Sequence, residues 1–189
     1  MTGDADIAAM SSLRAGNDLA LNEIMERWQL RVTGFLLRMV GEQTAAVDLA
    51  QETFVRVYQS RERYRPAGAF STWLFAIAAN LARQHLRWQR RHPTVSMDAE
   101  TEEDVSISEK LPAPGDSPGE SAQRRERAVL VKKAIGELPN DLREAVILFE
   151  YEDMSYVDIA AIAGCSVKAV ETRLYRARML LREKLASEL

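Results

Sequence analysis

The sequence has few of the residues that form disulfides, metal sites or cofactor sites. Its 189 residues include one cysteine, Cys165, and two histidines. A single cysteine excludes a disulfide within the chain and fits the reducing environment of the cytoplasm. One cysteine and two histidines also argue against the usual four-ligand zinc site. We therefore expect a cytoplasmic protein with no metal and no cofactor.

Long apolar runs and strand patterns are missing as well. No segment approaches the ~18–20 apolar residues of a membrane helix. The first residues, MTGDADIAAMSS, lack the basic start and apolar core of a secretory signal. Neither alternating polarity nor a hairpin turn is found along the chain. These absences predict an all-α protein that is not inserted in a membrane.

The formal net charge of −3 hides an uneven distribution of charge. Residues 93–121 hold eight acidic residues, one lysine and four of the six prolines. This composition predicts a flexible acidic linker. Residues 22–92 hold eleven arginines against six acidic residues, and residues 122–189 hold twelve basic against eleven acidic residues. Two basic units on either side of an acidic linker suggest a protein that binds one polyanion at two places.

Helical periodicity predicts two small helical bundles. We expect the first bundle within residues 1–92, the linker at 93–121 and the second bundle at 122–189. The predicted helices of the first bundle are residues 18–39, 43–60 and 71–91. Those of the second bundle are residues 121–137, 140–151, 156–163 and 167–185.

The end of the chain predicts a helix-turn-helix. Ser155 and Asp158 form a capping box, Gly164 ends the short helix in a left-handed conformation, and Ser166 caps the next helix. One face of that next helix is apolar, with Val167, Val170, Leu174, Ala177, Leu181 and Leu185. Its other side and flank carry Lys168, Thr172, Arg173, Tyr175 and Arg176. Basic and hydroxyl side chains near a helix N-terminus suit a DNA major groove. An ordinary helical hairpin with a solvated basic face remains the alternative.

The predicted helix 71–91 combines aromatic, amide and basic side chains. Its polar face carries Trp73, Ile77, Asn80, Gln84, Arg87 and Arg91, with Arg83 and Arg90 beside it. Aromatic rings stack on unpaired bases, amides bond to base edges, and arginines neutralise phosphates. The preceding loop carries Tyr64 and Arg65, which could line a pocket for an extruded base. The alternative is that Trp73 packs against a neighbouring helix and the arginines are only solvated.

The predicted helix 43–60 has an acidic face. Asp48 and Glu52 lie one turn apart, with Gln51 at the rim. We expect its buried side to hold Val47, Ala50, Phe54, Val57 and Tyr58. The carboxylates could hold a partner's arginines by charge-assisted hydrogen bonds. A simple solvated acidic face explains the pattern equally well.

Three ordered motifs resemble those of bacterial sigma factors. They are DLAQETFVRVYQ at residues 48–59, FSTWLFAIAANLARQHLR at 70–87, and LPNDLREAVILFEYEDMSYVDIAAIAGCSVKAVETRLYRARMLLREKL at 138–185. With only two domains, the chain is most similar to the extracytoplasmic-function (ECF, group 4) sigma factors. The resemblance implies sigma domain 2 in the first bundle and sigma domain 4 in the second. It also implies an RNA polymerase subunit that selects promoters and is not an enzyme.

The resemblance also assigns partners to the three faces. It implies that Asp48, Gln51 and Glu52 dock on the β′ clamp helices of core RNA polymerase, and the β subunit is a further expected contact. It implies that the unwound −10 element is bound by Tyr64, Arg65, Trp73, Asn80, Arg83, Gln84 and Arg87. It implies that the −35 duplex is read by Lys168, Thr172, Arg173 and Arg176. Because family members are commonly held inactive by an anti-sigma factor, such a factor is an expected partner.

Two departures from the family pattern concern promoter opening. Leu74 follows Trp73, where housekeeping sigma factors have two adjacent tryptophans, and Gln84 stands where the group often has an acid. The promoter sequence therefore cannot be carried over. We expect an alternative sigma factor for a stress or environmental response. The alternatives are a decoy that sequesters an anti-sigma factor and a one-component repressor, although a repressor would not explain the DLAQETF motif.

Overall fold

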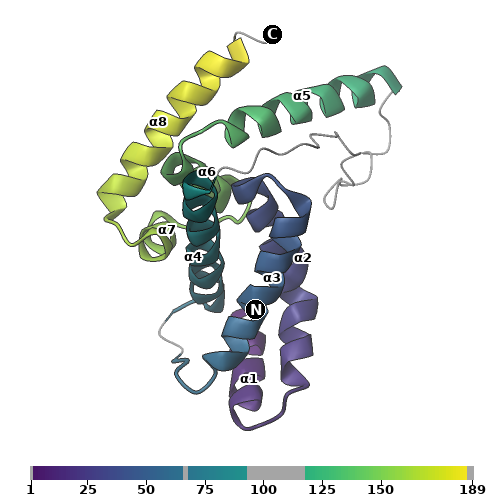
Figure 1. Ribbon diagram of the computed structural model, residues 1–189, viewed down its shortest axis with the longest axis vertical. Helices are drawn as coiled ribbons and strands as arrows, with labels where there is room; N and C mark the ends of the chain where they lie inside the picture. The colour runs from purple at the N-terminus through teal and green to yellow at the C-terminus, as the bar shows by residue number, and fades with distance from the viewer. Residues whose placement is uncertain (1, 66–67, 93–117, 187–189) are drawn as a thin grey trace.

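The computed structural model describes residues 2–65, 68–92 and 118–186, and every regular element in these ranges is an α-helix. The helices are α1 (Thr2–Arg14), α2 (Ala20–Val40), α3 (Gln43–Gln59), α4 (Phe70–Arg91), α5 (Pro118–Gly136), α6 (Asn140–Glu150), α7 (Tyr156–Ala163) and α8 (Val167–Ala186). They form two bundles, α1–α4 and α5–α8 (Figure 1). The all-α, two-bundle prediction is confirmed. No helix within the described ranges is both long and apolar enough to cross a membrane.

The core of the first bundle is built on aromatic rings. Phe35 of α2 meets Phe75 of α4 edge-on, with ring centroids 5.3 Å apart, and Trp28 lies 6.2 Å from the same ring. Buried residues recur every three or four positions along α2 and α4, which is the spacing of one helical face. This packing fixes α4 along the side of the bundle and leaves its polar face outward.

Helix α1 was not predicted from the sequence. Its inner face carries Ala9, Met10 and Leu13, but also Asp6, which is buried. The Asp6 carboxylate accepts hydrogen bonds from Arg27 Nε at 2.9 Å and from Trp28 Nε1 at 3.0 Å. An acid on the inner face weakens the apolar periodicity by which helices are recognised. The helix is therefore held by partners that only the folded chain provides.

The second bundle contains the predicted helix-turn-helix. Ser155 Oγ accepts from the Asp158 backbone N–H at 3.2 Å, Gly164 has φ = 63°, and Ser166 Oγ accepts from the Ala169 N–H at 3.2 Å. The capping box, the glycine stop and the second cap are all confirmed. The buried face of α8 holds Val170, Leu174 and Ala177. Val167 was placed on the same apolar face, but this first residue of α8 is exposed where the helix leaves the turn.

Helix α5 begins at Pro118, within the segment predicted as linker. Proline is favoured in the first turn of a helix because its missing N–H would have no intrahelical partner there. The rest of the predicted linker, residues 93–117, lies outside the described residues.

The two bundles lie against each other. Helix α4 packs on α7, and α2 packs on α6, so that α4 lies between the first bundle and the helix-turn-helix (Figure 1). Arg143 of α6 adds a direct bond, since its Nη1 donates to the carbonyl oxygen of Met39 at 2.7 Å. No pattern in the sequence predicts this contact. It sets the environment of Thr72 and Arg83 on α4, which bond to α7 and α6.

Candidate nucleic-acid interface

Helix α8 presents an open polar face at its N-terminal end. Lys168 is 86% exposed and pairs with Glu171 at 2.7 Å; this hydrogen bond raises the lysine pKa. Thr172 Oγ1 donates to the Lys168 carbonyl at 2.9 Å, and Arg176 is exposed. Together with residues of α6 they line a hollow of about 370 Å³. A shallow basic hollow with rotatable hydroxyl and ammonium donors suits phosphates and base edges of a duplex.

Arg173 is the least exposed of the four predicted DNA-binding residues of α8. Its guanidinium is half-buried, with Nε 3.5 Å from Asp141 Oδ2 and Nη1 donating to Cys165 Sγ at 3.6 Å. Cys165, in the turn between α7 and α8, is half-buried. The structure therefore brings the four predicted residues of α8 to one face, with Arg173 tied to α6 and to the turn.

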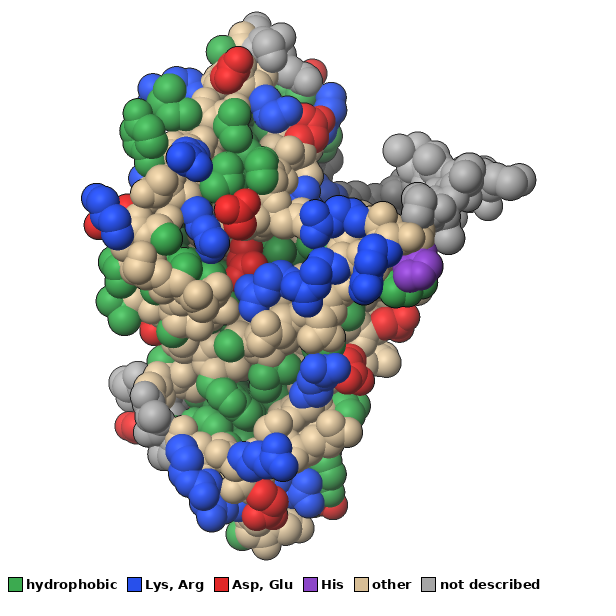
Figure 2. Space-filling view, turned by 60° about the vertical axis from the view of Figure 1, so that its left-hand side comes forward, with side chains coloured by type: hydrophobic (Ala, Val, Ile, Leu, Met, Phe, Trp, Pro, Cys, Tyr) green, Lys and Arg blue, Asp and Glu red, His purple; other side chains and the backbone are tan. Residues whose placement is uncertain are grey.

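The polar face of α4 is the second candidate surface. Asn80, Gln84 and Arg87 are exposed on it, and Arg83 is half-buried. Arg83 Nη2 donates to Asn80 Oδ1 at 2.5 Å, which places these two predicted residues in contact. A band of basic side chains crosses the middle of the molecule, with acidic side chains beside it (Figure 2). Arg83 contacts Glu144 of α6, with Nη1 2.5 Å from Oε1.

The aromatic residues before and within α4 form a cluster. The rings of Tyr64 and Trp73 lie 4.8 Å apart, and Phe70 lies 5.8 Å from Trp73. Tyr64 is only 8% exposed, and its hydroxyl makes no hydrogen bond within the described residues. Burial raises the pKa of this hydroxyl. Arg65 is exposed, and Trp73 is half-buried. Tyr64 therefore supports Trp73 from beneath, while Trp73 offers part of its ring to the surface.

The acidic residues of α3 lie on an outer face. Asp48 and Gln51 are exposed, and Glu52 accepts a hydrogen bond from Arg56 Nε at 2.8 Å. Two valines share this surface. Val47, expected to be buried, is 37% exposed, and Val55 is 46% exposed. The row of buried side chains on α3 includes Ala46 instead. The predicted start of this row was therefore wrong by one residue. A carboxylate face with apolar neighbours suits a protein partner.

Comparisons with known proteins identify the family. The model of Sigma-70 region 2 matches residues 24–92, and that of Sigma-70 region 4 matches residues 128–181. The ECF RNA polymerase sigma-E factor of Haemophilus influenzae is 36% identical over 181 residues, which is 95% of each chain. This chain belongs to the ECF sigma factors. The predicted family is thereby confirmed.

Other relatives and solved structures match nearly the whole chain. The RNA polymerase sigma-H factor of Pseudomonas aeruginosa is 36% identical over 180 residues, 94% of this chain and 92% of that one. The solved structure of CnrH in complex with the cytosolic domain of CnrY superposes with a TM-score of 0.71 at 26% identity, over 98% of this chain and 99% of that one. The sigma factor RpoE of Bartonella quintana, in complex with the anti-sigma factor NepR, superposes with a TM-score of 0.65 at 25% identity, over 87% and 96% of the chains.

Sequence reasoning missed three acidic residues of the second domain that face α2 and α4. They are Glu144 of α6, Glu152 of the following loop and Asp158 of α7. A signal was present, because Glu144 interrupts the apolar run of the motif LREAVIL. Buried charges are rare unless they are paired, so this position could have been marked as one that needs a basic partner.

Proposed function

We propose that this ECF sigma factor binds core RNA polymerase, directs it to a particular set of promoters and is regulated by an anti-sigma factor. It contributes promoter selection and no catalytic residue, and it acts in the cytoplasm. The proposal assigns sigma domain 2 to residues 1–92, the linker to 93–121 and sigma domain 4 to 122–189. One observation carries it: two polar faces of different chemistry, on α4 and α8, lie in the two regions that match sigma regions 2 and 4.

Reading of the −35 element is assigned to α8. Its exposed Lys168, Thr172 and Arg176 lie in the first half of the second helix of a helix-turn-helix, and this helix is the part of the motif that enters a major groove. An arginine can bond to both acceptors of a guanine edge, and a hydroxyl can bond to any base. Lysine contacts to phosphates fix the register of the helix on the duplex.

Capture of the −10 element is assigned to α4 and the loop before it. Extruding a base costs a few kcal/mol, which stacking and base-edge hydrogen bonds offset. Trp73 offers ring surface, the exposed amides of Asn80 and Gln84 offer donors and acceptors, and Arg87 offers charge for the backbone. Arg65 and Arg83 extend this charge, and Tyr64 supports the Trp73 ring.

Docking on the β′ clamp helices is assigned to Asp48, Gln51 and Glu52. The exposed valines beside them support this role, because a protein interface combines charge with apolar contact. Regulation by an anti-sigma factor is supported by the B. quintana relative, whose solved structure contains one. The β subunit is a further proposed contact.

Run-off transcription tests the function. The purified protein is added to core polymerase with genomic promoter fragments, and specific initiation is the expected result. The charge-reversed variant Asp48→Lys/Glu52→Lys should lose core binding, whereas Glu26→Lys, an exposed acid on α2, should keep it. A protein that binds an anti-sigma factor but not core polymerase would be the decoy, and the proposal would be wrong.

A further inference from the structure

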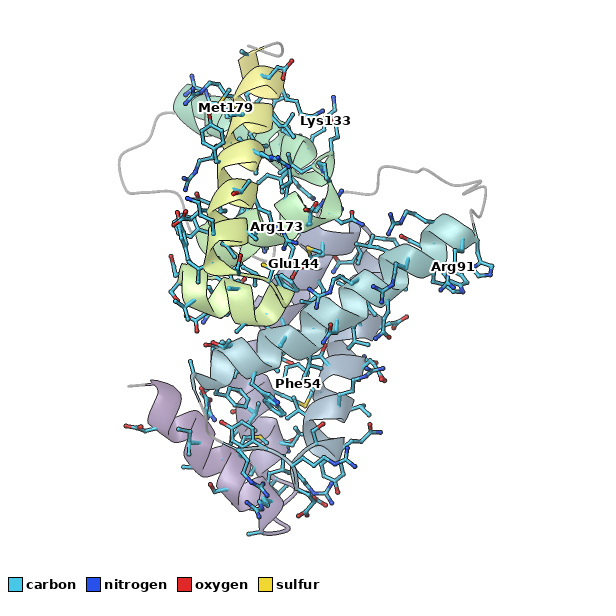
Figure 3. All side chains as sticks on the ribbon, turned by 90° about the vertical axis from the view of Figure 1, so that its left-hand side faces the viewer. Phe54, Arg91, Lys133, Glu144, Arg173 and Met179 are labelled. Carbon is cyan, nitrogen blue, oxygen red and sulfur yellow. The ribbon has the colours of Figure 1, made fainter. Side chains whose placement is uncertain are left out.

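The outer end of α4 exposes a second tryptophan, beyond the residues assigned so far. Trp88 is 49% exposed, whereas tryptophan is a highly buried residue on average. The last buried residue of α4 is Ala82, so the core ends before this ring begins. Figure 3 shows this end of the helix, marked by Arg91, extending outward from the bundle. Packing of the core therefore does not account for an indole at this position.

The Trp88 ring is paired with His92. The two rings are stacked, with centroids 5.1 Å apart and planes inclined by 26°. His92 Nδ1 lies 3.1 Å from the Trp88 carbonyl oxygen, to which it donates because a carbonyl oxygen can only accept. The His92 backbone N–H donates to the same oxygen at 2.9 Å. A ring pair that is held in this way loses little conformational freedom when a third ring stacks on it.

The surroundings of this ring pair are basic. Arg87, Arg90 and Arg91 are exposed, and α4 contains no acidic residue. Arg91 Nε donates to the Arg87 carbonyl oxygen at 3.4 Å, which keeps its guanidinium along the helix. Aromatic rings stack on unpaired bases, and neighbouring arginines neutralise the phosphates of the same strand. An exposed indole among arginines therefore suits single-stranded nucleic acid.

Trp88 also continues the face of α4 that is assigned to the −10 element. It follows Gln84 by four residues and so lies one turn further along the same side of the helix. Fifteen residues separate it from Trp73. At 1.5 Å per residue, the two rings mark the ends of a face about 22 Å long. A strand with about 3.4 Å per nucleotide covers this length with roughly six or seven nucleotides.

We propose that the stacked rings of Trp88 and His92 form a second platform for an unpaired base, so that single-stranded DNA runs along α4 from Trp73 to Trp88. The base stacks on the open part of the Trp88 indole, and Arg87 and Arg91 bind the adjoining phosphates. Only an unpaired base can do this, because the faces of a paired base are covered by its neighbours in the duplex. That the strand is promoter DNA rests on the proposed function, whereas stacking on single-stranded DNA does not.

Binding of short single strands to the full chain tests the platform. The probes are fluorescein-labelled dT8, which is long enough to reach both rings, and dT4, which is not; fluorescence anisotropy measures their affinity. Trp88→Ala should weaken dT8 binding about 5- to 150-fold, which is the usual loss for one stacked base. It should weaken dT4 binding much less, because Trp73 still binds the shorter strand. Leu30→Ala, which truncates an exposed apolar residue of α2, is the matched control and should change neither affinity.

Three further substitutions separate stacking from apolar contact. Trp88→Phe keeps an aromatic face and should recover most of the dT8 affinity. Trp88→Leu keeps only apolar volume and should bind dT8 as weakly as Trp88→Ala. His92→Ala should cause a smaller loss, because the indole remains but is no longer held in the stack. Thermal melting followed by circular dichroism checks that each variant is folded.

Salt and duplex measurements separate stacking from charge. Arg91→Ala should lower the slope of log affinity for dT8 against log salt by about 0.7, the value for one phosphate of a single strand. Trp88→Ala should leave this slope unchanged, because stacking on a base releases no counterion. A duplex of dA and dT strands should be bound equally by Trp88→Ala and by the unmodified chain.

Four results would overturn the platform. They are no measurable binding of dT8 to the unmodified chain, equal dT8 affinities of Trp88→Ala and Leu30→Ala, equal losses for dT8 and the duplex in Trp88→Ala, and full dT8 affinity in Trp88→Leu. The third result would mean that Trp88 contacts DNA without needing an unpaired base. The fourth would mean that the ring is an apolar contact, of the kind that a protein partner uses. None of these measurements uses polymerase, so a failure of the proposed function, seen as no binding to core, is distinguishable from a failure of the platform.

Discussion

The two proposed DNA-binding faces differ in how far the protein itself covers them. On α8, Lys168, Thr172 and Arg176 are exposed, and only Arg173 is tied to other side chains. On α4, Arg83 is held by Glu144 and by the end of α7. The number of basic residues on a face therefore does not show how many of them are exposed to bind DNA. Charges of both faces are visible in the sequence, but only the fold determines which of them are already bound.

The faces also differ in chemistry. The α8 face offers ammonium, guanidinium and hydroxyl groups on a rigid helix, which matches a duplex whose bases are read from the groove. The α4 face adds a half-buried indole and two amides, which match bases that have left the stack. From this difference we expect one promoter to be bound in two physical states, and mutations should separate the two.

The largest effect is expected from Arg176→Ala on binding of the −35 duplex. Loss of a bidentate base contact costs about 1–3 kcal/mol, which is roughly a 5- to 150-fold loss of affinity. The measurement is binding of the holoenzyme to a duplex promoter fragment found in the run-off experiment. Arg182→Ala, an exposed arginine further along α8, is the matched control and should change binding little. Equal losses in both variants would mean that α8 contributes only general charge.

Asn80→Ala is expected to have a smaller effect, on promoter opening and not on duplex binding. The variant should reduce promoter opening several-fold, because one hydrogen bond contributes about 1 kcal/mol. Duplex binding should be largely kept. Permanganate reactivity of unpaired thymines in the holoenzyme complex measures the opening. Asn22→Ala on α2 is the control, since Asn22 is also exposed. If Asn80→Ala weakens duplex binding as much as opening, the division between the two faces is wrong.

Much of the fold could be predicted because it is locally encoded. The caps at Ser155, Gly164 and Ser166 depend on neighbours within a few residues, and all three were predicted correctly. Helix α1 could not be predicted, because its Asp6 is satisfied by Arg27 and Trp28, 21 and 22 residues away. Local pattern carries no information about such partners.

The site was predicted less completely, for the same physical reason. The sequence places Arg83 and Asn80 on one helical face, since they are three residues apart. That Arg83 meets Glu144 depends on the packing of two domains, and the partners are 61 residues apart. The exposed valines of α3 were missed because a helix alone does not say which neighbours will cover it.

The smallest expected effect is a dependence of the stability of the folded chain on pH. Burial raises the pKa of Glu152 from 4.5 to about 7. Arg31 and Arg38 of α2 lower it, and the adjacent Asp153 raises it, but the burial effect is the largest. Unfolding returns the carboxyl to water, where its pKa falls toward the ordinary value. The folded chain therefore binds more protons than the unfolded chain between these two pH values.

The stability of the folded chain should fall with rising pH for this reason. The contribution of Glu152 to stability is complete below about pH 4.5 and is lost as the pH rises through about 7. Thermal melting followed by circular dichroism should therefore show a lower melting temperature at pH 8 than at pH 6. In Glu152→Gln the side chain no longer titrates, so the change between these two pH values should shrink, while Glu150→Gln should keep it. The raised pKa of Glu144 acts in the same direction and leaves a smaller residual change. A melting temperature that rises with pH over this range would show that the ionised pair of Arg31 and Glu152, 3.0 Å apart, outweighs the burial of the carboxyl.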